Sequence, residues 1–300
     1  MINCNKRDVV ILGANSSAGA SVTGCANGPD VLRDLGLLEE LSSISSTIDA
    51  GNVLDCAIED FWYINKIKSL YEVVECGGKI RKAISKYFRN NTLLLTIGGD
   101  HSISMGTIAE ILKYDDNVGI IYFDAHTDIN TELTSPTQNA HGMVLSALCG
   151  MCTSNLNKIR GNNILKQDNI FWIGTRSIDE DEKNNIKHPT NIYSCAKIQQ
   201  IGLASTLDEI LGKILEKGLK HIHVSFDIDV MDPNIIPATG VRVQGGLTIE
   251  DCMVFIEWLS NLPQICSIDF VEYNPLLDDK DFSSGKWCVN TIKNLIKYSI

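Results

Sequence analysis

Short apolar runs rich in β-favouring residues alternate with longer helix-favouring stretches along most of the chain. The runs have the length of buried strands, and the stretches between them are long enough to form helices that pack on a sheet. This alternation predicts βαβ units, in which parallel strands form one sheet with helices on both faces. We therefore expect the α/β class, as a three-layer α/β/α arrangement with a mostly parallel sheet flanked by helices. The expected strands are Val9–Gly13, Leu93–Ile97, Val118–Phe123, Ile170–Ile173, Ile222–Phe226 and Ile265–Val271.

The stretches between these runs carry local helix signals. Gly28 followed by Pro29 fits a helix start with proline in the first turn, and Thr248 with Asp251 fits a capping box. The serine-rich segment from Leu41 to Gly51 is expected to be a surface connection. No repeat or long linker divides the 300 residues, so we expect one domain over residues 1–300. The expected helical stretches are Pro29–Leu41, Phe61–Phe88, Ile103–Tyr114, Leu207–Leu215 and Thr248–Leu259.

Charge and hydropathy exclude several classes of partner. A net charge of -11 without a basic block disfavours nucleic acid. No stretch approaches the roughly 20 apolar residues of a membrane span, and the run Val9–Leu12 is too short for a signal peptide. We therefore expect a cytoplasmic protein with no membrane partner. Its ten cysteines are expected to be mostly buried thiols, because Cys149 and Cys152 have redox-motif spacing but lack the context of a redox or zinc site.

Polar residues gather directly after three of the expected strands. In open parallel sheets the ligand site lies outside the carboxyl ends of the strands. If the backbone stays extended for a few residues after Phe123, alternate side chains point to the same side and converge. Together the three strand ends contribute two imidazoles and four carboxylates, which are His101, Asp124, His126, Asp128, Asp227 and Asp229.

Each of these polar features has an ordinary explanation when it is taken alone, as a turn, a helix cap or a satisfied polar residue. The combination of these features has no such ordinary explanation. Four carboxylates in one pocket repel one another, and these motifs contain no lysine or arginine to offset the charge. Metal cations supply the missing charge. Carboxylate and imidazole ligands without thiolate favour a hard or borderline cation such as Mn²⁺. Six ligands suit two ions about 3.5 to 4 Å apart.

The same motifs resemble those of the ureohydrolases, the arginase and agmatinase family. The likeness rests on GGDHS at Gly98–Ser102, DAHTD at Asp124–Asp128 and SFDIDVMDP at Ser225–Pro233, in the order and separation of the family. It continues through PATG at Pro237–Gly240 and DFVEYNP at Asp269–Pro275, and it covers nearly the whole chain. A loop of arginase-like length that ends in NAHG makes the chain most similar to the arginases.

The resemblance implies two Mn²⁺ ions, with Co²⁺ or Fe²⁺ as alternatives for the same ligands. A hydroxide bridging the ions would attack the guanidinium carbon of L-arginine and give L-ornithine and urea. Asp128 would also accept a hydrogen bond from the hydroxide and hold it in line. One ion would be bound by His101, Asp124, Asp128 and Asp227, and the other by His126, Asp124, Asp227 and Asp229.

Further residues match substrate-handling positions of the family. His141 matches a proton-shuttling histidine, and Glu272 matches the carboxylate that pairs with the guanidinium group. Asp179 matches the partner of the α-amino group, and a polar loop matches the segment that holds the α-carboxylate. Ser135 and Glu182 fit ordinary polar surface residues equally well. The substrate-binding candidates are His126, Asn130, Ser135, Thr137, Asn139, Asp179 and Glu182.

The chain departs from the family pattern in three places. Arginases commonly have Ser-Gly-Asn where this chain has Thr137-Gln138-Asn139, so Gln138 replaces a glycine. If that glycine serves a positive φ, Gln138 is strained or the loop is reshaped. Val241 stands where a threonine is usual, and Ser177 stands where an acidic residue is common. These departures concern affinity and substrate choice more than metal chemistry.

Hydrolysis of L-arginine is therefore the leading hypothesis, with two alternatives. An agmatinase-like or other guanidino-compound hydrolase would use the same metal chemistry on a substrate without the α-carboxylate, but the polar loop from Asn130 to Asn139 favours a carboxylate. A non-catalytic metal-binding member of the family would not need His141 and Glu272. The resemblance also suggests a homo-oligomer, a trimer or a hexamer.

Overall fold

The sheet at the centre of the molecule is the feature that positions everything else. The computed structural model describes residues 7–54, 63–64, 67–153 and 155–300. Its strands are β1 (Asp8–Ala14), β2 (Thr47–Asn52), β3 (Tyr63–Ile64), β4 (Ile67–Lys68), β5 (Thr92–Gly98), β6 (Gly119–Phe123), β7 (Ile170–Ile173), β8 (Ile192–Tyr193), β9 (Ile222–Asp227) and β10 (Ile265–Val271). Eight of them form one sheet in the order β2-β1-β5-β10-β9-β6-β7-β8, and the neighbouring pairs are parallel. The expected α/β class is confirmed.

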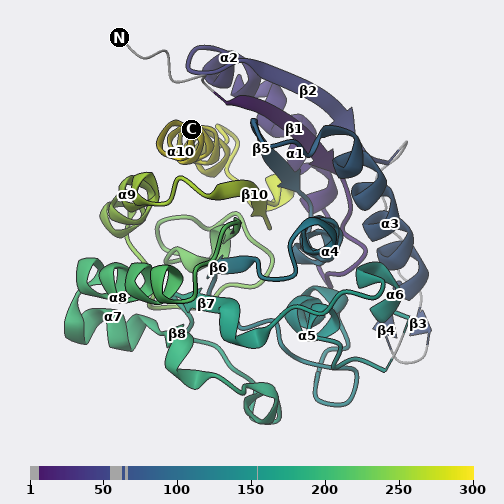
Figure 1. The fold of residues 1–300 in the computed structure, drawn as a ribbon. Helices are drawn as coiled ribbons and strands as arrows, with labels where there is room; N and C mark the ends of the chain where they lie inside the picture. Colours follow the sequence, from purple (N-terminus) through teal and green to yellow (C-terminus); the bar gives the residue numbers. More distant parts are fainter. Residues whose placement is uncertain (1–6, 55–62, 65–66, 154) are drawn as a thin grey trace.

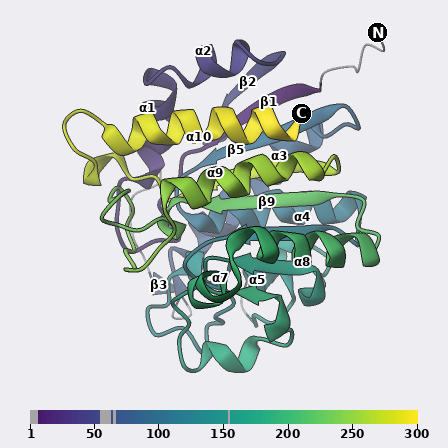
Figure 2. The same cartoon turned by 90° about the vertical axis from the view of Figure 1, so that its left-hand side faces the viewer.

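Helices cover both faces of this sheet, as expected. The helices are α1 (Gly28–Asp34), α2 (Leu37–Ser42), α3 (Leu70–Tyr87), α4 (Ser104–Tyr114), α5 (Val144–Leu148), α6 (Asn157–Arg160), α7 (Cys195–Ile201), α8 (Leu203–Glu216), α9 (Ile249–Trp258) and α10 (Ser283–Ser299). Helices α8, α9 and α10 lie on one side of the sheet, and α3, α4 and α5 lie on the other (Figure 1). Figure 2 faces the first side, with α8, α9 and α10 in front of the strands. In the described part of the chain, no helix combines the length and hydropathy needed to cross a bilayer.

The strand side chains alternate between two apolar layers. In β6, Ile121 and Phe123 belong to the core cluster that contains the apolar residues of α8, α9 and α10, and Phe123 stacks on Phe255 of α9 with 4.0 Å between ring centroids. Ile120 and Tyr122 belong instead to the cluster that contains those of α4 and α5. Because the central strands are buried on both faces, they read in the sequence as continuous apolar runs rather than as alternating patterns.

Several local expectations are confirmed. Each of the six expected strands is present with bounds that differ by at most one residue at either end. Helix α1 begins at Gly28 with proline in its first turn. At the start of α9, Thr248 and Asp251 form the expected capping box, in which each side chain accepts a hydrogen bond from the main chain of the other residue.

Other expectations about the elements are wrong. The serine-rich segment is not only a connection, because its second half continues into the edge strand β2. The edge strand β8 was not expected. The stretch Pro29–Leu41 forms two helices, because Gly36 adopts a left-handed φ of 93° between α1 and α2. In the stretch Phe61–Phe88 the helix begins only at Leu70, and positions 61, 62, 65 and 66 lie outside the described residues.

Candidate active site

A cavity of about 360 Å³ opens at the carboxyl ends of the central strands. The strand order places β5, β10, β9 and β6 side by side, so the segments that follow them meet at one edge of the sheet. Asp124 is fully buried and contacts both His101 and His126. The other residues expected from the sequence line the cavity, and they are His101, His126, Asp128, Asn130, Ser135, Thr137, Asn139, His141, Asp179, Glu182, Asp227, Asp229 and Glu272.

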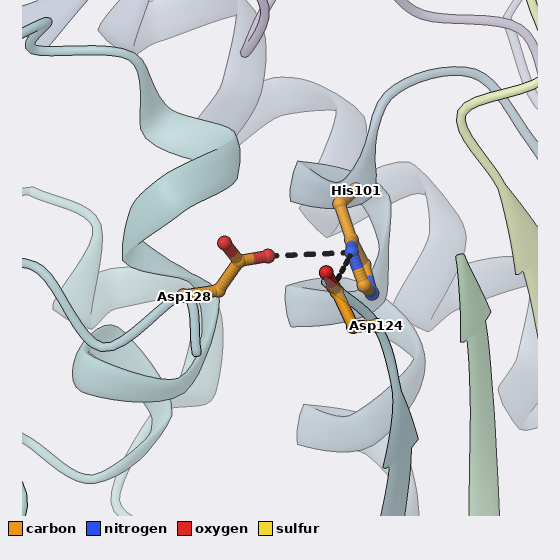
Figure 3. Close-up of side chains that lie close together, drawn as sticks. All are labelled: His101, Asp124 and Asp128. Carbon is orange, nitrogen blue, oxygen red and sulfur yellow. Dashed lines mark ion pairs between the residues drawn. The ribbon is translucent and has the colours of Figure 1, made fainter. Parts of the chain in front are cut away.

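Carboxylates from two segments surround the imidazole of His101, and Figure 3 shows two of them, Asp124 and Asp128, on the segment after β6. Its Nδ1 atom lies 3.0 Å from Oδ2 of Asp124, 3.0 Å from Oδ2 of Asp227 and 3.3 Å from Oδ2 of Asp128. On the other side of the ring, Nε2 lies 2.7 Å from Oγ of Ser225 in β9. One N–H cannot serve three acceptors well. The arrangement is therefore that of ligand atoms facing a common point rather than that of a simple hydrogen bond.

A second group of ligand atoms adjoins the first and shares Asp124 with it. Nδ1 of His126 lies 2.9 Å from Oδ2 of Asp229 and 3.4 Å from Oδ1 of Asp124. The main-chain N–H groups of Ala125 and Asp229 donate to Asp229 and Asp227 respectively, at 3.1 and 2.8 Å. Ligand atoms of His101, Asp124 and Asp128 lie within 4.8 Å of one another, and so do ligand atoms of Asp124, His126 and Asp229. The structure thus brings together all six residues expected as metal ligands.

The convergence after β6 has a different origin from the one expected. The strand ends at Phe123, and the following backbone bends instead of staying extended. The N–H of His126 donates to Oδ1 of Asp124 at 2.6 Å, and Asp128 adopts a left-handed φ of 47°. Simple alternation along an extended strand is therefore the wrong reason for the grouping. A side-chain-to-backbone turn and one left-handed residue bring the three side chains together.

The charge of this centre fits divalent cations. Among the described residues, no lysine or arginine nitrogen lies within 4.0 Å of a carboxylate oxygen of the four aspartates. Burial and the charges of Asp229 and Asp124 raise the pKa of Asp227 well above its usual range. Burial and the charge of Asp124 likewise raise the pKa of Asp128 to about 7. Oδ2 of Asp124 is buried and accepts no hydrogen bond. Bound cations would relieve the repulsion and use this oxygen, so the residues fit a metal centre.

Tyr122 is a part of the centre that sequence reasoning missed. Its ring stacks on the imidazole of His101, with 4.7 Å between centroids and 3° between planes, and its hydroxyl donates to Oδ2 of Asp128 at 2.8 Å. A signal was present in the sequence. A polar aromatic residue stands inside an apolar run two positions before Asp124, and so on the same face of the strand.

Arg176 also supports the centre without having been assigned a role. Its guanidinium donates to the carbonyl oxygens of Asp229, Val230 and Met231, at 2.7, 3.1 and 3.2 Å. It also donates to the carbonyl of Val243 at 2.8 Å. Arg176 therefore fixes the main chain that carries Asp229, one of the expected ligands, and no sequence motif signals a contact of this kind.

His141 and Glu272 lie side by side in the wall of the cavity. Nδ1 of His141 donates to Oε1 of Glu272 at 2.9 Å, and the main-chain N–H of His101 donates to the same oxygen at 2.8 Å. Burial lowers the pKa of His141, but the Glu272 carboxylate outweighs it and raises that pKa to about 9. Burial raises the pKa of Glu272, but His141 outweighs it and holds that pKa below its usual value. The two side chains thus form an ion pair, with Glu272 buried and His141 partly buried, beside the expected metal ligands.

The loop from Asn130 to Asn139 forms another wall of the cavity. Nδ2 of Asn130 donates to Oδ2 of Asp179 at 2.9 Å, which joins the loop to the segment after β7. Glu182 is buried, and its two carboxylate oxygens accept the main-chain N–H groups of Ile129 and Asp179. In this structure Glu182 therefore holds the backbone of both segments, which differs from an ordinary surface residue.

Comparison with known proteins gives this geometry a family. The sequence matches the model of the Arginase family over residues 7–295. The chain belongs to the arginase family. The arginase of Bacillus subtilis (strain 168) is 32% identical, and the match covers 97% of this chain and 98% of that protein. A crystal structure of Entamoeba histolytica arginase in complex with L-ornithine superposes with a TM-score of 0.88 at 30% identity, covering 96% and 98% of the two chains. The native structure of arginase from Bacillus caldovelox gives the same TM-score and identity over 97% and 98%.

The three departures from the arginase pattern all lie at or beside the cavity. Val241 and Ser177 line it. Gln138 adopts a left-handed φ of 60°, a backbone conformation that favours glycine. Gln138 therefore carries backbone strain in this loop.

The spaced cysteines do not have the environment of a redox pair. Cys149 and Cys152 are both free thiols. Burial raises the pKa of each to about 12. A reactive cysteine needs a thiolate near neutral pH. Packing is the role that these surroundings favour for both residues in this member of the arginase family.

Proposed function

We propose that the protein hydrolyses L-arginine to L-ornithine and urea. One observation carries this proposal. A single cavity joins the carboxylate and imidazole centre to Glu272 and to the polar loop from Asn130 to Asn139. The reacting carbon, the guanidinium nitrogens and the amino-acid end of the substrate would each have separate partners there. The similar Entamoeba histolytica arginase is solved with L-ornithine, which supports this assignment of the product.

The metal centre is proposed to hold two Mn²⁺ ions, although Co²⁺ or Fe²⁺ would suit the same ligands. When bound, such cations act as Lewis acids and make hydroxide available as a nucleophile near neutral pH. Asp124 and Asp227 are the proposed shared ligands, and Asp128 is also placed to orient the nucleophile. One ion would take His101, Asp124, Asp128 and Asp227, and the other His126, Asp124, Asp227 and Asp229.

Glu272 and His141 are proposed to handle the substrate guanidinium group and the leaving amine. The main-chain N–H of His101 fixes the carboxylate of Glu272, which can then accept paired hydrogen bonds from a guanidinium and set its plane. Because its pKa is raised to about 9, His141 carries a proton at neutral pH. It can therefore protonate the departing ornithine amine, which is a poor leaving group without that proton.

The amino-acid end is proposed to bind between the loop and the segment after β7. Asp179 would pair with the α-ammonium group. Asn130, Ser135, Thr137 and Asn139 would hold the α-carboxylate, and they are all buried or border the cavity. His126 faces the same space, and Glu182 would act through the main chain that it supports.

Tyr122→Phe is expected to weaken Mn²⁺ binding by roughly 10-fold or more and to lower turnover. The change removes the donor to Asp128 but keeps the ring that stacks on His101. Loss of a partner that orients a metal ligand typically costs 10- to 100-fold in metal affinity or activity. Competition titration of Mn²⁺ against a chelating dye measures the affinity.

Tyr193→Phe is the matched control, because Tyr193 in β8 is also buried and its hydroxyl also donates to a carboxylate, that of Glu209, at 2.9 Å. Both variants lose one such hydrogen bond, and each free energy of unfolding should fall by about 1 to 3 kcal/mol, with the smaller loss in Tyr193→Phe because the Glu209 side chain is more exposed than that of Asp128. Equal Mn²⁺ affinity in the two variants would show that the Tyr122 hydroxyl does not orient Asp128.

Substrate choice is tested by measuring urea release from L-arginine, agmatine and other guanidino compounds with manganese-loaded protein. We expect urea from L-arginine in preference to agmatine, because the loop offers hydroxyls and amides to an α-carboxylate that agmatine lacks. Activity on agmatine without activity on L-arginine would favour the agmatinase-like alternative. No urea from any compound would favour the non-catalytic alternative.

A further inference from the structure

Gln138 is an unusual residue for its place in the substrate loop. It adopts a left-handed φ of 60°, a conformation that L-residues other than glycine avoid because Cβ crowds the backbone. The side chain of Gln138, which causes this backbone strain, also makes contacts that a glycine could not make. Nε2 of Gln138 donates to the main-chain carbonyl oxygens of Ser135, at 2.6 Å, and of Glu132, at 3.2 Å. The side chain therefore spans the loop from its last residues back to its beginning.

The backbone at this position also sets the direction of two hydroxyl groups. The N–H of Gln138 donates to Oγ of Ser135 at 2.9 Å, and the N–H of Asn139 donates to Oγ1 of Thr137 at 3.3 Å. A main-chain N–H can only donate, so both hydroxyl oxygens act as acceptors there. The two hydroxyl oxygens lie 3.5 Å apart, so one hydroxyl at most can donate to the other. At least one O–H proton is left for an acceptor in the cavity that both residues line.

The beginning of the loop is itself fastened to the body of the protein. Oε1 of Glu132 accepts a hydrogen bond from the main-chain N–H of Thr153 at 2.6 Å and another from the Thr153 hydroxyl. Glu132 is buried. Because the Gln138 amide bonds to the carbonyl of this anchored residue, it links the segment from Ser135 to Asn139 to the anchored beginning of the loop. Without the amide, the segment from Ser135 to Asn139 would keep only its short-range hydrogen bonds.

We propose that Gln138 is a positioning residue that holds the hydroxyls of Ser135 and Thr137 ready for the α-carboxylate of the substrate. It acts through the loop and not by contact with the ligand. The inference rests on the proposed function, because it assumes that the cavity binds an amino acid through its α-carboxylate. It predicts an effect on ligands that carry the carboxylate and none on ligands that lack it. A role limited to loop stability would not distinguish the two kinds of ligand.

The test replaces Gln138 by methionine, which has similar length but cannot donate. With manganese-loaded Gln138→Met, we expect KM for L-arginine to rise about 5- to 20-fold, the effect of losing one or two hydrogen bonds, while kcat changes less than about 2-fold. Agmatine, which carries the guanidinium but no carboxylate, is tested as a competitive inhibitor, and its inhibition constant should stay within about 2-fold of wild type. A parallel rise for agmatine, or an unchanged KM for L-arginine, would overturn the proposal.

Gln138→Gly keeps the experiment decisive if the methionine variant folds poorly. Glycine adopts a φ of 60° without a steric penalty, so this variant relieves the backbone strain and removes only the side-chain contacts. KM for L-arginine should again rise, by at least about 3-fold given the loss of two hydrogen bonds. A wild-type KM in Gln138→Gly would show that the backbone conformation alone suffices. Leu133→Ala is the control on the same loop, because Leu133 is 80% exposed and lies away from the cavity lining.

Direct binding of L-ornithine, measured by calorimetry, separates this inference from the proposed function. If wild-type protein hydrolyses L-arginine but the Gln138 variants bind L-ornithine as well as wild type does, only the inference fails. If wild-type protein releases no urea yet binds L-ornithine with an affinity that falls in the variants, the proposed function fails and the inference stands. If wild-type protein neither releases urea nor binds L-ornithine, both are overturned.

Discussion

Replacing Asp124 by asparagine is expected to abolish metal binding and urea release together. Asp124 is fully buried, and its two carboxylate oxygens face His101 and His126 at 3.0 and 3.4 Å. In the described part of the chain it belongs to both candidate ligand groups, so the amide removes charge from both proposed ion sites. Loss of a residue that merely orients a ligand costs 10- to 100-fold. Loss of a shared ligand should therefore lower metal affinity and turnover by more than about 100-fold.

Two measurements check the Asp124→Asn result. Calorimetric titration with Mn²⁺ reports affinity and stoichiometry. Thermal unfolding with and without Mn²⁺ reports the stabilisation that follows when a ligand binds only the folded state, and this rise in Tm should be lost. Asp208→Asn is the matched control, because Asp208 is exposed on α8. An Asp124→Asn protein that still bound two Mn²⁺ ions with wild-type affinity would rule out the shared site.

His141→Ala is expected to lower turnover by about 10²- to 10⁴-fold while both ions stay bound, because general acid catalysis contributes roughly that much. His141 contacts Glu272, and among the described residues no hydrogen bond or ion pair joins its side chain to the proposed ligands. The pH dependence of kcat/KM gives a second readout. The His141 pKa is raised to about 9, so its proton is present below that pH and is lost above it. In wild type, kcat/KM should include a fall as pH rises through about 9, and the variant should lack that contribution.

The metal content of His141→Ala decides between two roles for the residue. Retained metal with low turnover supports a proton-transfer role. Loss of metal would mean that His141 supports the centre structurally. His188→Ala is a control for the removal of an imidazole, because the His188 side chain is 40% exposed, pairs with Asp168 and does not line the cavity. It should retain wild-type turnover and metal content.

The fold could be predicted from the sequence where burial dominates. The central strands are covered on both faces, so their side chains are almost all apolar and their runs stand out, as in β5 and β10. The edge strands β2 and β8 were not expected, because an edge strand is less buried and so need not form an apolar run. Strand β2 (TIDAGN) is half-buried and polar, and β8 is two residues long. Their pairing depends on the neighbouring strand more than on their own composition.

The grouping of the proposed metal ligands could be predicted to a similar extent. The six proposed ligands follow strands that the parallel sheet brings to one edge, so residue type and order suffice to group them. The residues that hold those ligands in place could not be found in this way. Arg176 acts on main-chain carbonyls that are more than 50 positions away, and Tyr122 acts through stacking and one hydroxyl.

The sequence by itself determined the layered α/β architecture, the identity of the proposed ligands and the family, because these depend on residue types at fixed separations. Only the tertiary structure decided how the site is held. It showed that Asp128 and Gln138 both adopt left-handed backbone conformations, that Glu272 is paired with His141, and that Gln138 closes the substrate loop through two carbonyl oxygens. Backbone conformation and hydrogen-bond direction depend on contacts between distant segments, and no local pattern of residues encodes them.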